Sequence, residues 1–105
     1  MMRVYRANLS RLSAHNVRLA VGSDQFRSTS VPEALALAKA GLITPAALLR
    51  SLTIDTPATI FPKRAPFGLA EGAPADLLVF ENDPLADFSA ITRIARRVKA
   101  GEELR

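Results

Sequence analysis

The sequence has 105 residues, of which 49% are hydrophobic and 23% charged, a balance typical of one globular domain or of a piece of a larger one. It has no cysteine, which excludes disulfides and thiolate metal sites and agrees with a reducing compartment. Arginines interrupt the N-terminal segment, so it does not resemble a signal peptide, and no apolar run approaches the roughly 20 residues that span a bilayer. We therefore expect a cytoplasmic protein without a membrane partner.

The net charge of +4 is concentrated in the first half of the chain. Residues 1–50 hold seven basic and two acidic side chains, whereas residues 51–105 hold seven and eight. A basic half is one property of nucleic-acid-binding proteins. Here the arginines are scattered and aromatic residues are only 6% of the chain, too few for base stacking. We expect a solvated face, or a surface covered by other protein structure, and no nucleic-acid partner.

Residues 2–15 are predicted to form a helix. Val4, Leu9 and Leu12 fall near one face, and the arginines lie largely opposite. Asn16 is suited to end the helix because asparagine tolerates the left-handed backbone conformation.

A hydrophobic run at residues 17–21 predicts a short buried strand, which Gly22 ends. The next residues are Ser23 and Asp24, so a carboxylate stands at the carboxyl end of this strand. In α/β barrels and open α/β sheets, functional sites are built at that end. The alternative interpretation is that Asp24 only caps a turn or the next helix.

Three further helices are expected in close succession. Ser30 and Glu33 form a capping-box pattern at the start of a helix over residues 31–40. A threonine followed by proline then opens a helix over residues 44–53 and a shorter one over residues 56–62. Short links between them predict a packed helical layer.

The predicted elements change from helices to strands after residue 62. We therefore predict a boundary between residues 1–62 and residues 63–105. Residues 76–81 are the clearest strand in the chain, because they hold a continuous hydrophobic run. Residues 92–99 alternate as a second strand, and residues 100–102 can form a hairpin turn into the last residues.

Three motifs, in this order and spacing, carry a resemblance to a known family. They are Gly22-Ser23-Asp24, Ala75-Asp76-Leu77-Leu78-Val79-Phe80 and Asn82-Asp83-Pro84-Leu85. Together they resemble the C-terminal part of metal-dependent amidohydrolases, in the branch of imidazolonepropionase and Xaa-Pro dipeptidase-like proteins. The resemblance runs from about residue 8 to about residue 104.

This resemblance implies an α+β fold that is a fragment of a (β/α)8 amidohydrolase barrel. Residues 1–62 would be the last barrel strand with its flanking and closing helices. Residues 63–105 would be the C-terminal part of a small antiparallel β-subdomain, which in the family combines strands from both ends of the chain.

The resemblance also implies hydrolysis of a C–N bond in an amide or cyclic amide, with Asp24 as the catalytic residue. In the family an aspartate at the end of the eighth strand contacts a divalent metal such as zinc and handles the proton. Asp24 is the residue that matches this position, as base towards water and then as acid towards the leaving nitrogen. Gln25 and Phe26 occupy loop positions that can line the substrate pocket, and we assign them no role from the sequence.

The sequence holds too few metal-ligating residues for a complete hydrolytic metal site. A hydrolytic zinc site needs about three protein ligands, usually several of them histidines. The sequence has one histidine, His15, which lies at the far end of the predicted strand from Asp24. A strand of about seven residues spans over 20 Å at roughly 3.3 Å each, so the two side chains cannot share a metal within one chain. We therefore expect no cofactor and no hydrolysis in the isolated chain, and a metal at Asp24 only if histidines are supplied from elsewhere.

A lone barrel strand has two unpaired edges, which favours pairing with another chain. The sequence therefore predicts a homo-oligomer, or a complementing chain that carries the missing strands. The alternative is a binding or structural module that uses this fold without catalysis.

Overall fold

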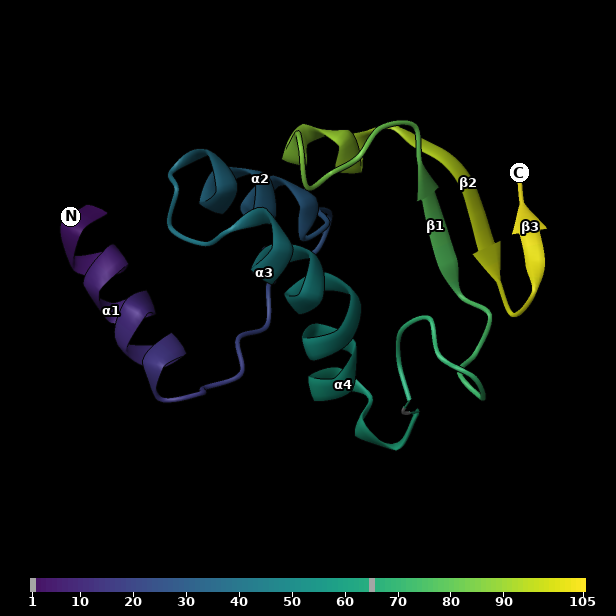
Figure 1. The fold of residues 1–105 in the computed structure, drawn as a ribbon, viewed down its shortest axis with the longest axis horizontal. Coiled ribbons are helices and arrows are strands. Elements are labelled where there is room, and N and C mark those ends of the chain that lie inside the picture. The colour runs from purple at the N-terminus through teal and green to yellow at the C-terminus, as the bar shows by residue number, and fades with distance from the viewer. Residues whose placement is uncertain (1, 65) are drawn as a thin grey trace.

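The computed structural model describes residues 2–64 and 66–105 (Figure 1). The molecule is elongated, about 44 × 29 × 29 Å, with the N-terminal helix at one end, a small sheet at the other and the remaining helices between them. The elements in chain order are α1 (Met2–Ala14), α2 (Val31–Lys39), α3 (Pro45–Arg50), η1 (Ser51–Asp55), α4 (Thr56–Ile60), η2 (Pro62–Arg64), β1 (Leu77–Phe80), η3 (Phe88–Thr92), β2 (Ile94–Lys99) and β3 (Glu102–Leu104).

Helix α1 ends as its sequence predicted. Asn16 has φ 55°, the left-handed conformation that stops the helix. The helix is tied to the rest of the chain by Arg6, whose guanidinium donates to the carbonyl oxygens of Gly41 at 3.1 Å and Ala40 at 3.3 Å. These carbonyls lie just beyond the C-terminus of α2, where a positive charge is favoured.

The strand predicted at residues 17–21 does not form. The segment is irregular, and it pairs with no strand in the part of the chain that the structure describes. Its backbone groups bond to side chains of the helical run instead: Ser51 Oγ donates to the Leu19 carbonyl at 2.7 Å, and the Val21 N–H donates to Thr56 Oγ1 at 3.0 Å. The prediction was wrong because a strand is completed by a neighbouring strand, which a hydrophobic run alone does not supply.

Helix α2 begins without the predicted capping box. Ser30 adopts a helical conformation, with φ −74° and ψ −8°, and its side chain makes no capping hydrogen bond. The Val31 N–H is instead paired with Thr29 Oγ1 at 3.3 Å. Because a capping side chain needs an extended backbone at its own residue, the helical turn at Ser30 excludes the reciprocal bond to Glu33.

Helices α3 and α4 form one continuous run through the π-helical segment η1, so the predicted break near residue 56 is absent. Thr44 caps the start as expected, accepting a hydrogen bond from the Ala47 N–H at 3.2 Å. Pro57 has no N–H to donate within the helix, and the Thr56 N–H reaches back five residues to the Ser51 carbonyl. Widening of the turn to π-helix is one way in which a helix accommodates such a site.

The sheet is antiparallel, with strand order β1-β2-β3. Leu77 lies opposite Val98, and Val98 lies opposite Glu103, with a bulge in β2 at Ala95, since the pair Val79–Arg96 is followed by the pair Phe80–Ile94. The strands predicted at residues 76–81 and 92–99 form over Leu77–Phe80 and Ile94–Lys99, and the predicted hairpin turn is confirmed. The fold is thus α+β with a small three-stranded antiparallel sheet, and the strands of a (β/α)8 barrel are not present in the described residues.

The hydrophobic core lies between the helices and the segment that leads into β2. Leu48 of α3 and Ala34 of α2 are wholly buried, and Phe88 and Ile91 of η3 pack against them together with Val21. The core therefore draws on both sides of the boundary that we predicted at residue 62, and the division into two units stays a prediction.

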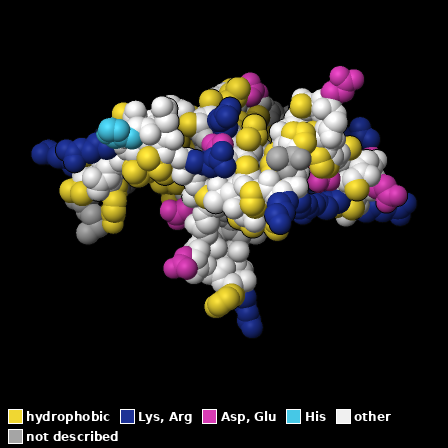
Figure 2. All heavy atoms as spheres, turned by 90° about the horizontal axis from the view of Figure 1, so that it is seen from below, with side chains coloured by type: hydrophobic (Ala, Val, Ile, Leu, Met, Phe, Trp, Pro, Cys, Tyr) yellow, Lys and Arg dark blue, Asp and Glu magenta, His cyan; other side chains and the backbone are white. Residues whose placement is uncertain are grey.

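Much apolar surface remains exposed. Figure 2 shows hydrophobic side chains interspersed with charged ones over one whole face of the molecule. Val4 and Tyr5 of α1 are at least half exposed, and so is Leu78 of β1. Within residues 2–64 and 66–105, none of the helices has both the length and the apolar character needed to cross a membrane.

Candidate functional site

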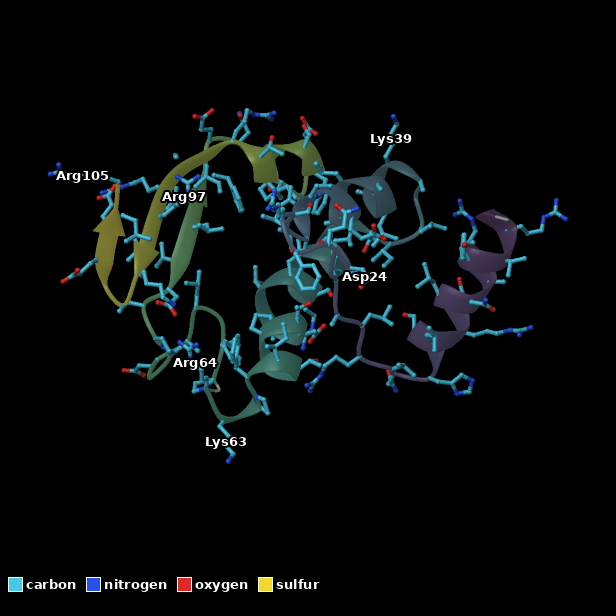
Figure 3. The ribbon with its side chains drawn as sticks, turned by 180° about the vertical axis from the view of Figure 1, so that it is seen from behind. Asp24, Lys39, Lys63, Arg64, Arg97 and Arg105 are labelled. Atoms are coloured by element: carbon cyan, nitrogen blue, oxygen red, sulfur yellow. The ribbon has the colours of Figure 1, made fainter. Side chains whose placement is uncertain are left out.

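Asp24 lies in the loop that follows the segment 17–23, in the central part of the molecule (Figure 3). Its side chain is exposed, and its backbone has φ 55°, a left-handed conformation that few non-glycine residues adopt. Its carboxylate makes no ion pair with any residue of the described chain. The carboxylate is therefore available to a ligand or to another polypeptide.

A compact turn holds the residues around Asp24. Ser23 Oγ accepts from the Gln25 N–H at 3.2 Å and lies within hydrogen-bonding distance of the Gln25 carbonyl as well, also at 3.2 Å. The Gln25 carbonyl in turn accepts from the Ser28 N–H at 3.4 Å. The four residues from Ser23 to Phe26 line a hollow of about 320 Å³. Asp24, Gln25 and Phe26, which are neighbours in the sequence, thus border one open hollow.

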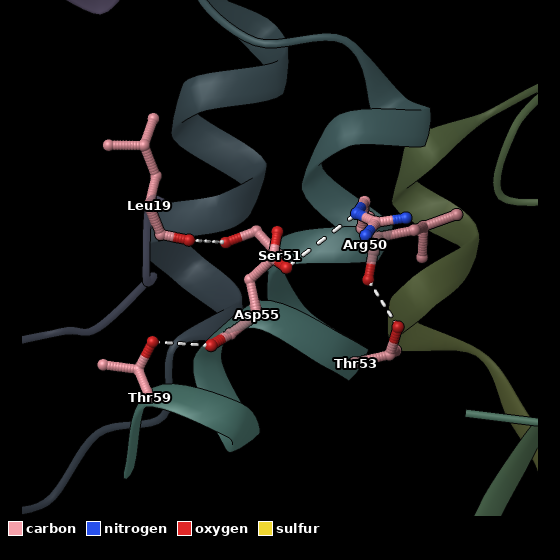
Figure 4. Close-up of polar contacts among 7 residues, drawn as sticks. Leu19, Arg50, Ser51, Thr53, Asp55 and Thr59 are labelled. Carbon is pink, nitrogen blue, oxygen red and sulfur yellow. Dashed lines mark hydrogen bonds and ion pairs between the residues drawn. The ribbon is translucent and has the colours of Figure 1, made fainter. Parts of the chain in front are cut away.

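The segment leading to Asp24 is fixed by two hydroxyl groups of the helical run, one of which is drawn in Figure 4. Ser51 is only 6% exposed, and its hydroxyl donates to the Leu19 carbonyl. Thr56 accepts from the N–H of Val21, a buried residue three positions before Asp24. Neither of these two hydrogen-bonding hydroxyls was predicted from the sequence. The available signal was Ser51 itself, a polar residue on the same face as the buried Leu48 and the half-buried Leu52.

A larger cavity of about 580 Å³ lies between α1 and the start of the α3–η1 run. Leu9, Val17, Leu42 and Ile43 give it an apolar lining, and Arg50 stands among its polar residues. Asp24 does not line this cavity. The two hollows are thus separate, and the larger one reflects how loosely α1 packs on the other helices.

The residues present do not fit a metal centre by themselves. The described residues contain no group of three or more His, Cys, Asp or Glu side chains that could hold a metal ion. His15, the single histidine of the sequence, is exposed just after α1 and does not line the hollow at Asp24. Any metal bound near Asp24 would need its other ligands from outside this chain.

Comparison with models of protein families gives no match, and comparison with curated proteins gives none either. Two solved structures are similar in fold. One is an uncharacterized protein, with a TM-score of 0.77 and 24% sequence identity. The other is a prolidase solved in complex with N-methylphosphonate-L-proline, with a TM-score of 0.73 and 25% identity.

In both cases the similarity covers 95% of this chain but only 26% of the solved chain. This chain therefore spans about a quarter of the length of the structures that it matches, and it has the fold of a fragment of a prolidase-like protein. These two similarities support the resemblance to a fragment of an amidohydrolase that the sequence suggested.

Proposed function

We propose that this chain forms the C-terminal part of a prolidase-like amidohydrolase, which hydrolyses the C–N bond of Xaa-Pro dipeptides. In this proposal the chain is inactive alone, and its contribution is the Asp24 carboxylate together with the helices and sheet that hold it in place. The complete barrel, the metal and the substrate belong to the whole enzyme.

The structural similarity to a prolidase is the main support for the proposal. Nearly the whole chain superposes on one quarter of a prolidase, so its fold is accounted for as part of that larger protein. The described chain also leaves large hydrophobic side chains and their apolar surface in water, among them Leu69 and Leu85. The proposed remainder of the enzyme would cover part of it.

The chemistry proposed for Asp24 is transfer of one proton. The carboxylate would accept a proton from the attacking water as the new C–O bond forms, and would give it to the proline nitrogen as the C–N bond breaks. An exposed carboxylate without an ion-pair partner, held on a turn that hydroxyl anchors fix, is suited to that task. We derive no step through a metal, because the described residues do not form a site for one.

The proposed partner is the polypeptide segment that carries the remaining barrel strands, either joined to this chain or separate from it. The backbone of residues 17–23 is held only by side-chain hydroxyls and by the end of α1 within the described structure. In the assembled enzyme a neighbouring strand would pair with it.

Reconstitution tests the proposal. The quarter of the matching prolidase on which this chain superposes is deleted, and the remainder is co-expressed either with that quarter or with this chain. The prolidase's own quarter must first restore hydrolysis of an Xaa-Pro dipeptide, which establishes that the split enzyme assembles. We expect this chain to restore hydrolysis as well. A complex that forms and stays inactive would instead support a non-catalytic module.

A further inference from the structure

We propose that Phe26 is a specificity-determining residue of the assembled enzyme, whose aromatic ring contacts the ring of the substrate's proline. The inference rests on the proposed function and extends it, because it assigns a substrate contact to a second residue of this chain.

The first observation is the exposure of Phe26. Its relative exposure is 110%, the highest of the exposed large hydrophobic residues in the described structure. Removing a phenylalanine ring from water is favourable, so a ring left wholly exposed is a surface that a ligand or a partner can cover with gain in free energy.

The second observation is what lies next to the ring. Phe26 and Asp24 border the same open hollow of about 320 Å³, together with Ser23 and Gln25. Gln25 is held by both of its hydrogen bonds to Ser23 Oγ, which limits movement of the ring relative to the carboxylate. One side of the hollow is therefore charged and another is apolar.

The chemistry of an Xaa-Pro bond matches this pair of groups. The nitrogen that leaves is itself a member of the pyrrolidine ring, so a carboxylate that protonates it comes close to the ring carbons. An apolar aromatic ring two residues away on the same turn is in place to pack against those carbons. A glycine at the same substrate position would offer no ring to contact, so Phe26 would favour proline over glycine.

The test uses the reconstituted enzyme, with the dipeptides Leu-Pro and Leu-Gly as probes. We expect Phe26→Ala to raise KM for Leu-Pro by about tenfold with kcat within about twofold, and to lower the preference for Leu-Pro over Leu-Gly by a similar factor. Phe26→Leu keeps an apolar side chain and should retain most of the preference. Leu69→Ala removes an exposed apolar side chain outside the hollow; it is the control and should leave the preference unchanged.

The outcomes separate this inference from the proposed function. If wild-type chain gives no hydrolysis although the prolidase's own quarter does, the proposed function fails and this inference fails with it. If wild-type chain is active and Phe26→Ala keeps both KM and the preference for proline, only the role of Phe26 is overturned. A lower melting temperature of the assembled Phe26→Ala enzyme, with unchanged preference, would show that the ring packs against the partner polypeptide and would equally contradict a substrate contact.

Discussion

The hydroxyl of Ser51 donates a 2.7 Å hydrogen bond to the carbonyl oxygen of Leu19, and Ser51 is the one buried polar residue found in the described core (Figure 4). With the bond from Val21 to Thr56, it replaces the strand pairing that the hydrophobic run at residues 17–21 would otherwise make. Two hydroxyls of a helical run thereby position the loop that holds Asp24.

Removing the Ser51 hydroxyl should destabilise the protein. Ser51→Ala leaves the Leu19 carbonyl without its partner, and we expect the free energy of unfolding to fall by about 1–2 kcal/mol, measured by urea denaturation. Thr53→Ala is the control, because the exposed Thr53 hydroxyl bonds only to the Leu49 carbonyl of its own helical run and should change stability by less than about 0.5 kcal/mol. Equal effects of the two substitutions would contradict the anchoring role.

Leu48 should be the most sensitive core position among those described. It is 0% exposed and is the largest side chain in the described structure that is fully buried. Leu48→Ala removes buried methyl groups and leaves a cavity, so we expect a loss of about 2–5 kcal/mol in the free energy of unfolding. Leu85, which is 57% exposed, provides the comparison, and Leu85→Ala should cost less than about 0.5 kcal/mol.

Acid should weaken the hairpin through Asp76. The Ala100 N–H donates to its carboxylate at 2.7 Å and Lys99 lies 3.6 Å away, and these contacts, the first above all, lower the pKa of Asp76 below its ordinary value of 3.8. A pKa lowered by folding stabilises the folded state above pH 3.8, and this contribution is lost as the pH falls through the lowered pKa.

We therefore expect the free energy of unfolding to fall less steeply between about pH 5 and pH 2 in Asp76→Asn than in the wild type. The remaining slope comes from groups such as Asp87 and Glu103, whose pKa values are lowered by Ser89 and by Arg96. An Asp76→Asn slope equal to that of the wild type would contradict the role of this contact.

Asp24→Asn should abolish the proposed activity without unfolding the chain. Asparagine also tolerates the left-handed conformation found at this position, so the turn should survive. Loss of the proton acceptor should lower kcat of the reconstituted enzyme by about 10²–10⁴-fold. Asp83→Asn removes a carboxylate elsewhere and should leave kcat unchanged; a fully active Asp24→Asn enzyme would exclude Asp24 as the base.

The elements predicted correctly are those set by local chemistry. Thr44 caps α3 through its own side chain, Asn16 ends α1, and a hairpin turn joins β2 to β3. In each case the residues that determine the structure lie within a few positions of one another or across one turn, so a local pattern is sufficient.

One error concerns interactions with distant parts of the chain, and the others concern local helix geometry. The hydrophobic composition of residues 17–21 predicted a strand. Their backbone groups instead form hydrogen bonds with side-chain hydroxyls more than 30 residues away. Pro57 suggested a break, yet packing of the run and a π-helical turn keep the helix continuous. For the candidate site, the neighbouring positions of Asp24 and Phe26 were visible in the sequence, whereas their shared hollow and the exposure of the ring required the structure.

The most direct test of the central claim is to read the genomic DNA immediately upstream of the codon for Met1. If this chain is the C-terminal part of a prolidase-like amidohydrolase, we expect an in-frame or frameshifted stretch that encodes a His-x-His pair and two further histidines. That result would make Asp24 a catalytic residue of a longer enzyme. If neither the upstream sequence nor a neighbouring gene encodes these histidines, the claim is contradicted and Asp24 is left as a turn residue of an independent module.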